Sequence, residues 1–413
     1  MSAHKRSRGE GSIYPYKNGR FAAYVWVTTP DGRRDRKYVY GSTREEVHAE
    51  WIKLHQAAMA GPVSVRTPTL KDFLAYWLRE VVGPTTRPKT AETYGMHVRL
   101  HILPSLGDKR LDKLTRRDIR MWLNRLAADC QCCGQAKDAS RPRCQQRCCA
   151  IGDCCEQRLS PRTVQDVRAV LRAALNAAIS EDLIARNPAD GIKLPRQRAR
   201  RLRPWSVEEA RRFLESARCD RDPMYAAYVL ILVLGLRRGE VLGLTWPMVD
   251  LESAEIEVRF SLQRIGGQLV NGETKTPSSD AVLPLPDICL AALRLQERAR
   301  CKARTLAGTQ WIETGHIIAT RDGQPVEPRN FYRAFQRRCL KAGVRPIPVH
   351  GTRHTCGSLL AALDVHPRVA MQILRHSKID VTMEIYTHIP SELTRKALRK
   401  LGDQLEGTDE LAI

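Results

Sequence analysis

The first sixty residues alternate between apolar and polar positions in short runs, which is the pattern of half-buried β-strands. The alternating apolar residues of the longest run are Phe21, Ala23, Val25 and Val27. Turn signals at residues 17–20 (KNGR) and 30–32 (PDG) separate three such runs. Ser42 or Thr43 then caps a helix with apolar positions at helical spacing. We therefore predict three strands and one helix over residues 1–60.

From residue 69 the apolar residues recur three or four positions apart, the period of an amphipathic helix. The first such stripe consists of Leu70, Phe73, Leu74, Trp77 and Leu78. Further helices are predicted over residues 89–100, after a cap at Thr115, and over residues 162–184. An all-helical domain is therefore expected over residues 69–192.

The C-terminal half begins with helical patterns and then turns to strands. Ser206 caps a helix, and the apolar run at residues 224–234 predicts a second helix that ends at Gly235. Residues 255–286 alternate like two or three strands, with Lys275 in the last turn between them. We therefore expect an α+β multidomain protein: a small β-sheet-plus-helix domain, an all-helical domain, and a mostly helical domain with a small antiparallel sheet.

The charge balance indicates a polyanionic partner. The 413 residues include 68 lysines and arginines against 45 acidic residues, a formal net charge of +23. This surplus exceeds what solubility requires, and nucleic acid is the first candidate. No apolar run approaches the ~18 residues of a membrane span, and the basic N-terminus lacks the apolar core of a signal peptide. We therefore expect a cytoplasmic, nucleoid-associated protein without a membrane partner.

Basic residues gather in two segments that the phosphate backbone of a nucleic acid could contact. One is the predicted three-stranded sheet, and the other is a proline-bounded linker at residues 193–205. A charge run is more often a solvated surface, but this linker joins two predicted DNA-binding domains. The candidate DNA-binding residues are Arg20, Arg33, Arg34, Arg36 and Lys37 in the sheet and Arg198, Arg200 and Arg201 in the linker.

Eight of the thirteen cysteines lie in an insertion between two predicted helices. They are Cys130, Cys132, Cys133, Cys144, Cys148, Cys149, Cys154 and Cys155. Thiols in a chain without an export signal are better interpreted as metal ligands than as disulfides. A metal ion with tetrahedral thiolate ligands stabilises a segment that has little apolar core. The CxC, CC and CxxxC spacings are not those of a regular zinc finger, however. A structural zinc site and a redox-sensitive or disulfide-prone hairpin therefore remain alternatives, and the spacing does not select the ligands.

The strongest chemical signal lies near the C-terminus, where His350, Arg353, His376 and Tyr386 follow one another. A tyrosine hydroxyl can act as a nucleophile, and the guanidinium fork of arginine matches the geometry of a phosphate. Fixed donors of this kind stabilise the charge that develops in a transition state. Each residue alone would more often be structural. Together they favour attack on a phosphodiester.

Residues 206–390 resemble the catalytic domain of the tyrosine recombinases, the integrases of phages and integrative plasmids. The segments LGLRRGEVLGL, HGTRHTCGSLL and ILRHSKIDVTMEIYTH are similar to the three sequence boxes of that family, in the family's order. The upstream part also resembles these integrases, although most relatives lack a cysteine-rich insertion. The resemblance divides the chain into an arm-type DNA-binding domain (1–60), a helical, SAM-like core-binding domain (69–192, with the insertion at 130–155), a basic linker (193–205), the catalytic domain (206–390) and a C-terminal tail helix (391–413).

The resemblance implies the roles of the reacting groups. Tyr386 is the nucleophile that becomes joined to a DNA 3′-phosphate, and Arg237 and Arg353 bind the non-bridging oxygens of the scissile phosphate. Because the phosphate is transferred to a phenol, the energy of the bond is retained, and no cofactor is expected for catalysis. The protein is thus expected to be a site-specific recombinase that cuts and rejoins DNA and integrates a mobile element at an attachment site.

The resemblance also implies the groups that assist. Lys275 is expected to protonate the leaving 5′-oxygen, His350 to assist proton transfer, and His376 to hydrogen-bond the phosphate. Glu240 and His354 occupy supporting positions.

One position departs from the family pattern. Arg375 stands where relatives usually carry a glycine directly before the histidine of the third box. Glycine suits a tight backbone bend, so a different local turn is expected here.

The expected partners are double-stranded DNA carrying attachment sites, further copies of the chain in a homotetramer on DNA, and an excisionase-type accessory protein. Two alternatives are a type IB topoisomerase-like enzyme and a non-catalytic DNA-binding or architectural protein. Arm-like and core-like domains argue against the first, since relaxation of DNA needs no second site. The presence of all six catalytic residue types argues against the second.

Overall fold

The structure is a computed structural model that describes residues 13–29, 32–61, 67–195, 203–273 and 280–375, together with Ile379 and Met383. The chain divides into two compact units, residues 1–198 and residues 199–413. Over the described ranges, none of the helices combines the length and apolar content that a membrane crossing requires. The predicted α+β class is confirmed.

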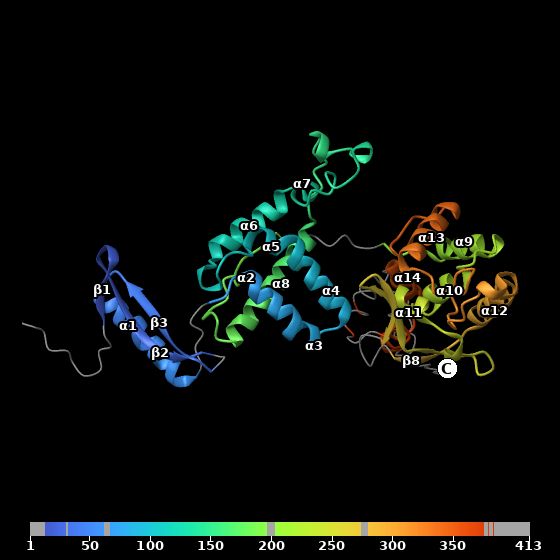
Figure 1. Ribbon diagram of the computed structural model, residues 1–413. Helices are drawn as coiled ribbons and strands as arrows, with labels where there is room; N and C mark the ends of the chain where they lie inside the picture. The colour runs from blue at the N-terminus through green and yellow to red at the C-terminus, as the bar shows by residue number, and fades with distance from the viewer. Residues whose placement is uncertain are drawn as a thin grey trace, which may run out of the picture. The chain divides into compact units, whose positions relative to one another are not determined.

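The N-terminal part of the first unit is a three-stranded antiparallel sheet with a helix on one face (Figure 1). Its elements are β1 (Tyr14–Tyr16), β2 (Arg20–Thr28), β3 (Arg34–Gly41) and α1 (Arg44–Ala60). Val25 and Val27 of β2 pack against Leu54 of α1. Thr43 caps α1 and accepts a hydrogen bond from the backbone N–H of Glu46, whose side chain accepts from the backbone of Thr43 in return. The predicted strand alternation and helix start are confirmed.

The helical part of the first unit is built around a second core. Its longer elements are α2 (Leu70–Tyr76), a π-helical turn (Trp77–Val82), α4 (Pro88–His97), α6 (Arg116–Ala128) and α8 (Pro161–Ser180). Trp122 of α6 is 1% exposed, and its indole N–H donates to the carbonyl of His101 at 3.1 Å. The predicted extension of the last helix to residue 184 is wrong. Asp182 is left-handed (φ 55), and Leu183 N–H returns to the carbonyl of Ala178, which closes the helix end.

The second unit contains α9 (Val207–Cys219), α10 (Tyr225–Val233), α11 (Arg238–Gly243), α12 (Asp287–Ala307), α13 (Pro328–Lys341), α14 (Val349–Ala362) and α15 (Pro367–Leu374). The apolar α10 contacts α9, α11, α12 and α14, and its residues 226–232 are all buried. This helix forms the centre of the core because every face of it is apolar.

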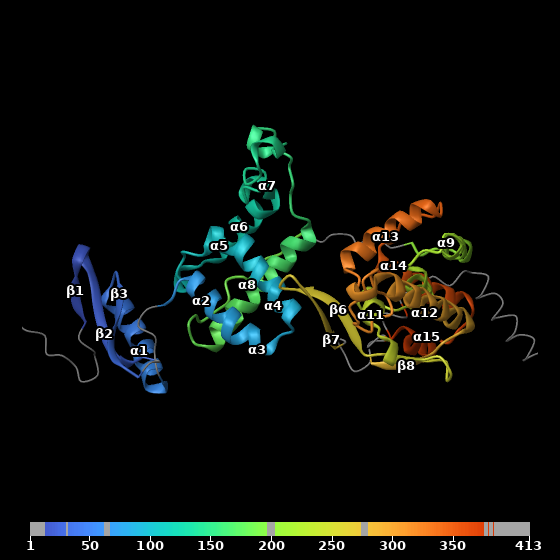
Figure 2. The same cartoon turned by 45° about the vertical axis from the view of Figure 1, so that its right-hand side comes forward.

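The strands of the second unit form two small antiparallel sheets in the described ranges, instead of the single sheet of two or three strands that was predicted. They are β4 (Val249–Asp250), β5 (Glu255–Val258) and β8 (Ala281–Pro284) in one sheet and β6 (Phe260–Ile265) and β7 (Gln268–Glu273) in the other. The β6–β7 hairpin packs against α11 (Figure 2). A side chain at Gly239 of α11 would lie 2.3 Å from Oγ of Ser261, so this close approach needs glycine.

The segment that enters the second unit is fixed to α14. The backbone N–H of Trp205 donates to Oγ1 of Thr355 at 3.1 Å, and its indole N–H donates to the carbonyl of Arg345 at 2.7 Å. The Arg345 guanidinium in turn donates to the carbonyls of Arg203 and Pro204. The start of the unit is therefore held to the helix that carries the second sequence box.

Candidate functional site

A sharp turn between α10 and α11 places Arg237. Gly235 in this turn has φ +60, a conformation that favours glycine, and a Cβ there would lie 2.6 Å from Cδ2 of Leu374, which would have to move. Arg237 then caps α11, and its backbone N–H donates to Oε2 of Glu240 at 2.9 Å. The turn thus presents the Arg237 side chain at the start of the helix.

Glu240 is a buried carboxylate between two guanidinium groups. It is 2% exposed and accepts from Nη1 of Arg237 at 2.6 Å and from Nη2 of Arg375 at 2.7 Å. Burial alone would raise the pKa of Glu240, but the positive charges of Arg375 and Arg237 and the hydrogen bonds from Arg237 outweigh it and lower that pKa. Glu240 is therefore an anion that orients both arginines.

Arg353 joins this group from α14. It is 3% exposed, and its Nη1 donates to the carbonyl of Gly235 at 2.7 Å. Burial and the neighbouring charges of Arg237 and Arg375 lower the pKa of Arg353. Three guanidinium groups face one carboxylate here, so the site carries a surplus of positive charge. A phosphodiester anion would relieve it.

His350 and His354 stand one turn apart on α14 beside this group. Their rings contact each other edge to face, with centroids 5.4 Å apart. The His350 residue is exposed, yet partial desolvation by the surrounding protein lowers its pKa, and its neighbours His354, Arg353 and Arg237 lower it further. Since the ordinary pKa of histidine is about 6.5, His350 is neutral at pH 7 and can exchange a proton.

Arg375 is a site residue that the sequence did not assign a role. It ends α15 in the left-handed conformation (φ 53, ψ 50), is 2% exposed and reaches back to Glu240. The prediction of a different local turn is therefore wrong: the left-handed bend that suits glycine is present, and an arginine makes it. The only signal in the sequence was the departure from the family pattern directly before His376.

Replacing Arg375 separates two opposing contributions to stability. Loss of a buried ion-pair partner costs about 3 kcal/mol, whereas glycine relieves about 1 kcal/mol of left-handed backbone strain. Because the ion pair contributes more free energy than the backbone strain costs, we expect both Arg375→Gly and Arg375→Ala to lower the Tm of this unit. The Tm of Arg375→Ala should fall by about 2–4 °C more than that of Arg375→Gly, since alanine keeps the strain. Thermal unfolding of the three proteins measures this. A Tm of Arg375→Gly at or above that of the unchanged protein would contradict the ion-pair role.

The structure thus brings together four residues predicted for the site, Arg237, Glu240, His350 and Arg353, with His354 beside them. Lys275, His376 and Tyr386 lie outside the described residues, as do Arg198, Arg200 and Arg201. The strand β7, which ends at Glu273, is tied to α11 because the side-chain amide of Asn271 donates to the carbonyl of Gly243 at 3.1 Å.

The predicted DNA-binding residues of the N-terminal sheet lie on both of its faces. Arg36 is paired with Trp26 across the strands, and its guanidinium lies 4.5 Å from the centroid of that indole ring. Arg34 lies over the same ring at 5.4 Å. Lys37 is paired with the buried Val25, so strand alternation turns it to the helix side. Arg20, Arg33, Arg34 and Arg36 are exposed, and Lys37 is half-buried.

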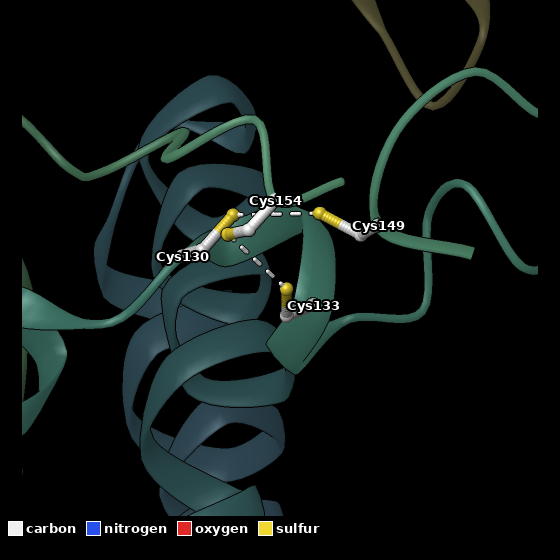
Figure 3. A group of neighbouring side chains, drawn as sticks. All are labelled: Cys130, Cys133, Cys149 and Cys154. Carbon is white, nitrogen blue, oxygen red and sulfur yellow. Dashed lines mark hydrogen bonds between the residues drawn. The ribbon is translucent and has the colours of Figure 1, made fainter. Parts of the chain in front are cut away.

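Seven of the eight clustered cysteines lie close together, and Cys144 is in neither of the groups that they form. One group of four consists of Cys130, Cys133, Cys149 and Cys154 (Figure 3). The other consists of Cys132, Cys148, Cys149 and Cys155. Within each group the sulfur atoms all lie within 4.8 Å of one another, so each group could hold a metal ion. Sequence analysis missed that Cys130 and Cys133 form a C-x₂-C pair, which Cys132 between them obscures.

A buried aspartate organises the loop that carries two of these cysteines. Asp138 is 0% exposed and accepts hydrogen bonds from the backbone N–H groups of Arg147, Cys148 and Ala150, while Arg141 forms an ion pair with it at 2.9 Å. Burial would raise the pKa of Asp138, but these hydrogen bonds outweigh it and lower the pKa to about 2. The anion therefore fixes residues 147–150 next to α7 (Gln131–Gly134).

Two family models match the sequence. Residues 200–392 match the phage integrase family, and residues 69–127 match the N-terminal SAM-like domain of phage integrases. A tyrosine recombinase XerC-like protein of Caldanaerobacter subterraneus subsp. tengcongensis is 25% identical over 410 residues, which cover 94% of this chain and 97% of that protein.

Solved structures share the fold. The Tn1549 transposon integrase in complex with transposon right end DNA is similar with a TM-score of 0.62 and 22% identity, over 81% of this chain and 100% of that one. A lambda integrase tetramer bound to a Holliday junction is similar with a TM-score of 0.54 and 17% identity, over 92% of this chain and 96% of that one.

Proposed function

Since this chain belongs to the phage integrase family and is a site-specific recombinase of the tyrosine class, we propose that Tyr386 is its nucleophile. The phenolic oxygen bonds to phosphorus, the bond between phosphorus and the 5′-oxygen breaks, and a 3′-phosphotyrosine linkage forms. A 5′-hydroxyl of the second DNA then attacks this linkage and releases the tyrosine. Because one phosphoester replaces another, rejoining needs no nucleotide cofactor.

The observation that supports this proposal best is the cluster of guanidinium groups. Arg237 and Arg353 come from helices far apart in the sequence and meet at the Gly235 turn, where Glu240 orients Arg237. Two preorganised guanidinium groups can neutralise the charge on the non-bridging oxygens in the transition state. Arranging them before DNA binds avoids the cost of reorganisation during the reaction.

Proton transfer requires groups near the two bridging oxygens. We assign protonation of the leaving 5′-oxygen to Lys275, because an alkoxide is too basic to depart without a proton. The neutral His350 assists proton transfer, and His376 donates a hydrogen bond to the phosphate. Glu240 and His354 support the arrangement.

Recombination needs two DNA sites, so the active form is proposed to be a homotetramer on double-stranded DNA. The lambda integrase tetramer on a Holliday junction supports this proposal. Each chain is proposed to consist of the arm-binding, core-binding and catalytic domains that the sequence predicts. The exposed arginines over Trp26 contact arm-site DNA. An excisionase-type protein sets the direction of recombination. The protein works in the cytoplasm on nucleoid DNA. The cysteine-rich insertion holds structural zinc, which has no role in the chemistry.

Trapping the covalent intermediate tests the assignment of the nucleophile. A DNA core site with a nick close to the cleavage position loses its 5′-hydroxyl fragment and cannot be rejoined. We expect the adduct to survive protein denaturation and peptide mass spectrometry to place the nucleotide on Tyr386. A phosphorylated tyrosine elsewhere, or no adduct under conditions of DNA binding, would contradict the proposal.

A further inference from the structure

The two groups of cysteines share one residue, Cys149, and this sharing determines how many metal ions the insertion can hold. We propose that the insertion binds two zinc ions, each with four thiolate ligands, and that the Cys149 thiolate bridges them. The remaining ligands are Cys130, Cys133 and Cys154 for one ion and Cys132, Cys148 and Cys155 for the other. This inference rests on the proposal of structural zinc made above and specifies its number and ligands.

The distances between sulfur atoms fit such a cluster. A zinc ion with four thiolates at about 2.3 Å separates the sulfurs by about 3.8 Å along each edge of the tetrahedron. The contacts within the groups are 3.7 Å for Cys133 and Cys154, 3.8 Å for Cys132 and Cys148, and 3.7 Å for Cys149 and Cys155. A disulfide would bring a pair to about 2.05 Å. The sulfurs are therefore spaced like thiolates that share metal ions and not like bonded pairs. Cys130 and Cys155, which belong to different groups, also lie only 3.9 Å apart.

Backbone contacts help to bring the ligands together. Asp138 fixes the loop that carries Cys148 and Cys149, as described above. Gly152 then reverses the chain in the left-handed conformation (φ 87), and the backbone N–H of Asp153 donates to the carbonyl of Cys148 at 3.1 Å. This reversal returns Cys154 to Cys133 of α7 and Cys155 to Cys130, which directly precedes that helix. A polar scaffold thus presents seven thiols at one place.

The insertion has little else to stabilise it. Of residues 130–158, all of which the structure describes, only Gln131, Cys132 and Asp138 are buried. A segment of this size without an apolar core normally depends on metal ions or disulfides for its fold. Zinc binding would supply the missing stability, since the free energy of metal binding adds to that of folding.

The charge of the site is consistent with this proposal. Binding of two Zn²⁺ ions by seven thiols releases up to seven protons and leaves a cluster with three negative charges. The same segment carries Lys137, Arg143 and Arg147, which oppose that charge. Cys144 lies outside both groups and is exposed, so it provides a matched control.

Native mass spectrometry of the full-length chain, purified with zinc and a reducing agent, tests the number of ions. We expect a mass increase for two zinc ions per chain, and the same increase for Cys144→Ser. One zinc ion would overturn the two-ion cluster and leave a structural zinc site. A chain without bound zinc would overturn both proposals, and neither result would bear on recombination, which the covalent adduct reports.

Cysteine variants and substitution of zinc by cadmium test whether the Cys149 thiolate bridges the two ions. We expect Cys130→Ser to retain more zinc than Cys149→Ser, because the shared thiolate serves both ions; equal losses would overturn the sharing. To separate loss of zinc from loss of folding in Cys149→Ser, the unchanged chain loaded with cadmium-113 provides a second measurement. Two cadmium resonances with spin coupling between them are expected through a bridging sulfur, and two resonances without coupling would overturn it.

Discussion

Replacing Arg353 by alanine is expected to slow strand cleavage by about 10²–10³-fold, the usual cost of removing one preorganised donor to a transition state. Core-site DNA should still bind measurably, because most of the affinity comes from contacts elsewhere along the phosphate backbone. Single-turnover cleavage of a nicked core site and a gel-shift titration measure the two effects separately. Arg353→Lys keeps the charge but loses the bidentate fork, so an intermediate rate is expected.

Stability must be checked for the same variants. Arg353→Ala removes the donor to the buried carbonyl of Gly235, which costs about 1–3 kcal/mol, so cleavage is compared at a temperature where all variants remain folded. Arg304→Ala, which changes an exposed arginine in the last turn of α12, is the matched control and should cleave at the unchanged rate. Undiminished cleavage by Arg353→Ala would refute the assignment.

Replacing Glu240 by alanine should have the largest effect on stability. The change leaves Arg237 and Arg375 without their shared carboxylate, and loss of one partner from a buried ion pair costs about 3–5 kcal/mol. The expected fall in Tm is about 2–4 °C per kcal/mol for a unit of this size. The matched control is Glu257→Ala, which removes an exposed ion pair with Arg259 at 2.6 Å and should cost less than about 1 kcal/mol. Similar losses for the two variants would contradict the role of Glu240.

The effect of Glu240 should also depend on pH. Its pKa is lowered in the folded protein, so the charged form stabilises the fold fully above the ordinary carboxyl pKa of about 4.3. This stabilisation is lost as the pH falls through the lower, folded-state pKa. The difference in Tm between the unchanged protein and Glu240→Gln should therefore shrink in acid. A difference that is constant from neutral to acid pH would mean that the charge of Glu240 contributes nothing.

Local patterns in the sequence predicted the elements that depend on neighbours along the chain. The caps at Thr43, Thr115 and Ser206 are of this kind, because each needs only a carboxylate three residues later. Strand pairing was less predictable. β5 pairs with β8 across the whole β6–β7 hairpin, and alternation within each strand contains no information about its partner.

Two parts of the candidate sites depended on long-range contacts that the sequence does not reveal. Arg375 keeps an unfavourable left-handed backbone because Glu240, distant in the sequence, binds its side chain. The grouping of the cysteines depends on Asp138, whose buried carboxylate collects backbone donors from a loop about ten residues away. Arg237, Glu240, His350 and Arg353 were identified from their sequence boxes, and the structure places them around one turn.

In the proposed mechanism, the guanidinium groups around the Gly235 turn bind an anion, the scissile phosphate. Arginine stays protonated throughout the physiological pH range. Neither acidification nor the binding of a cofactor is therefore needed for these side chains to bind an anion. The timing of DNA cleavage in the proposed mechanism is then expected to depend on when DNA and the nucleophile meet at these arginines.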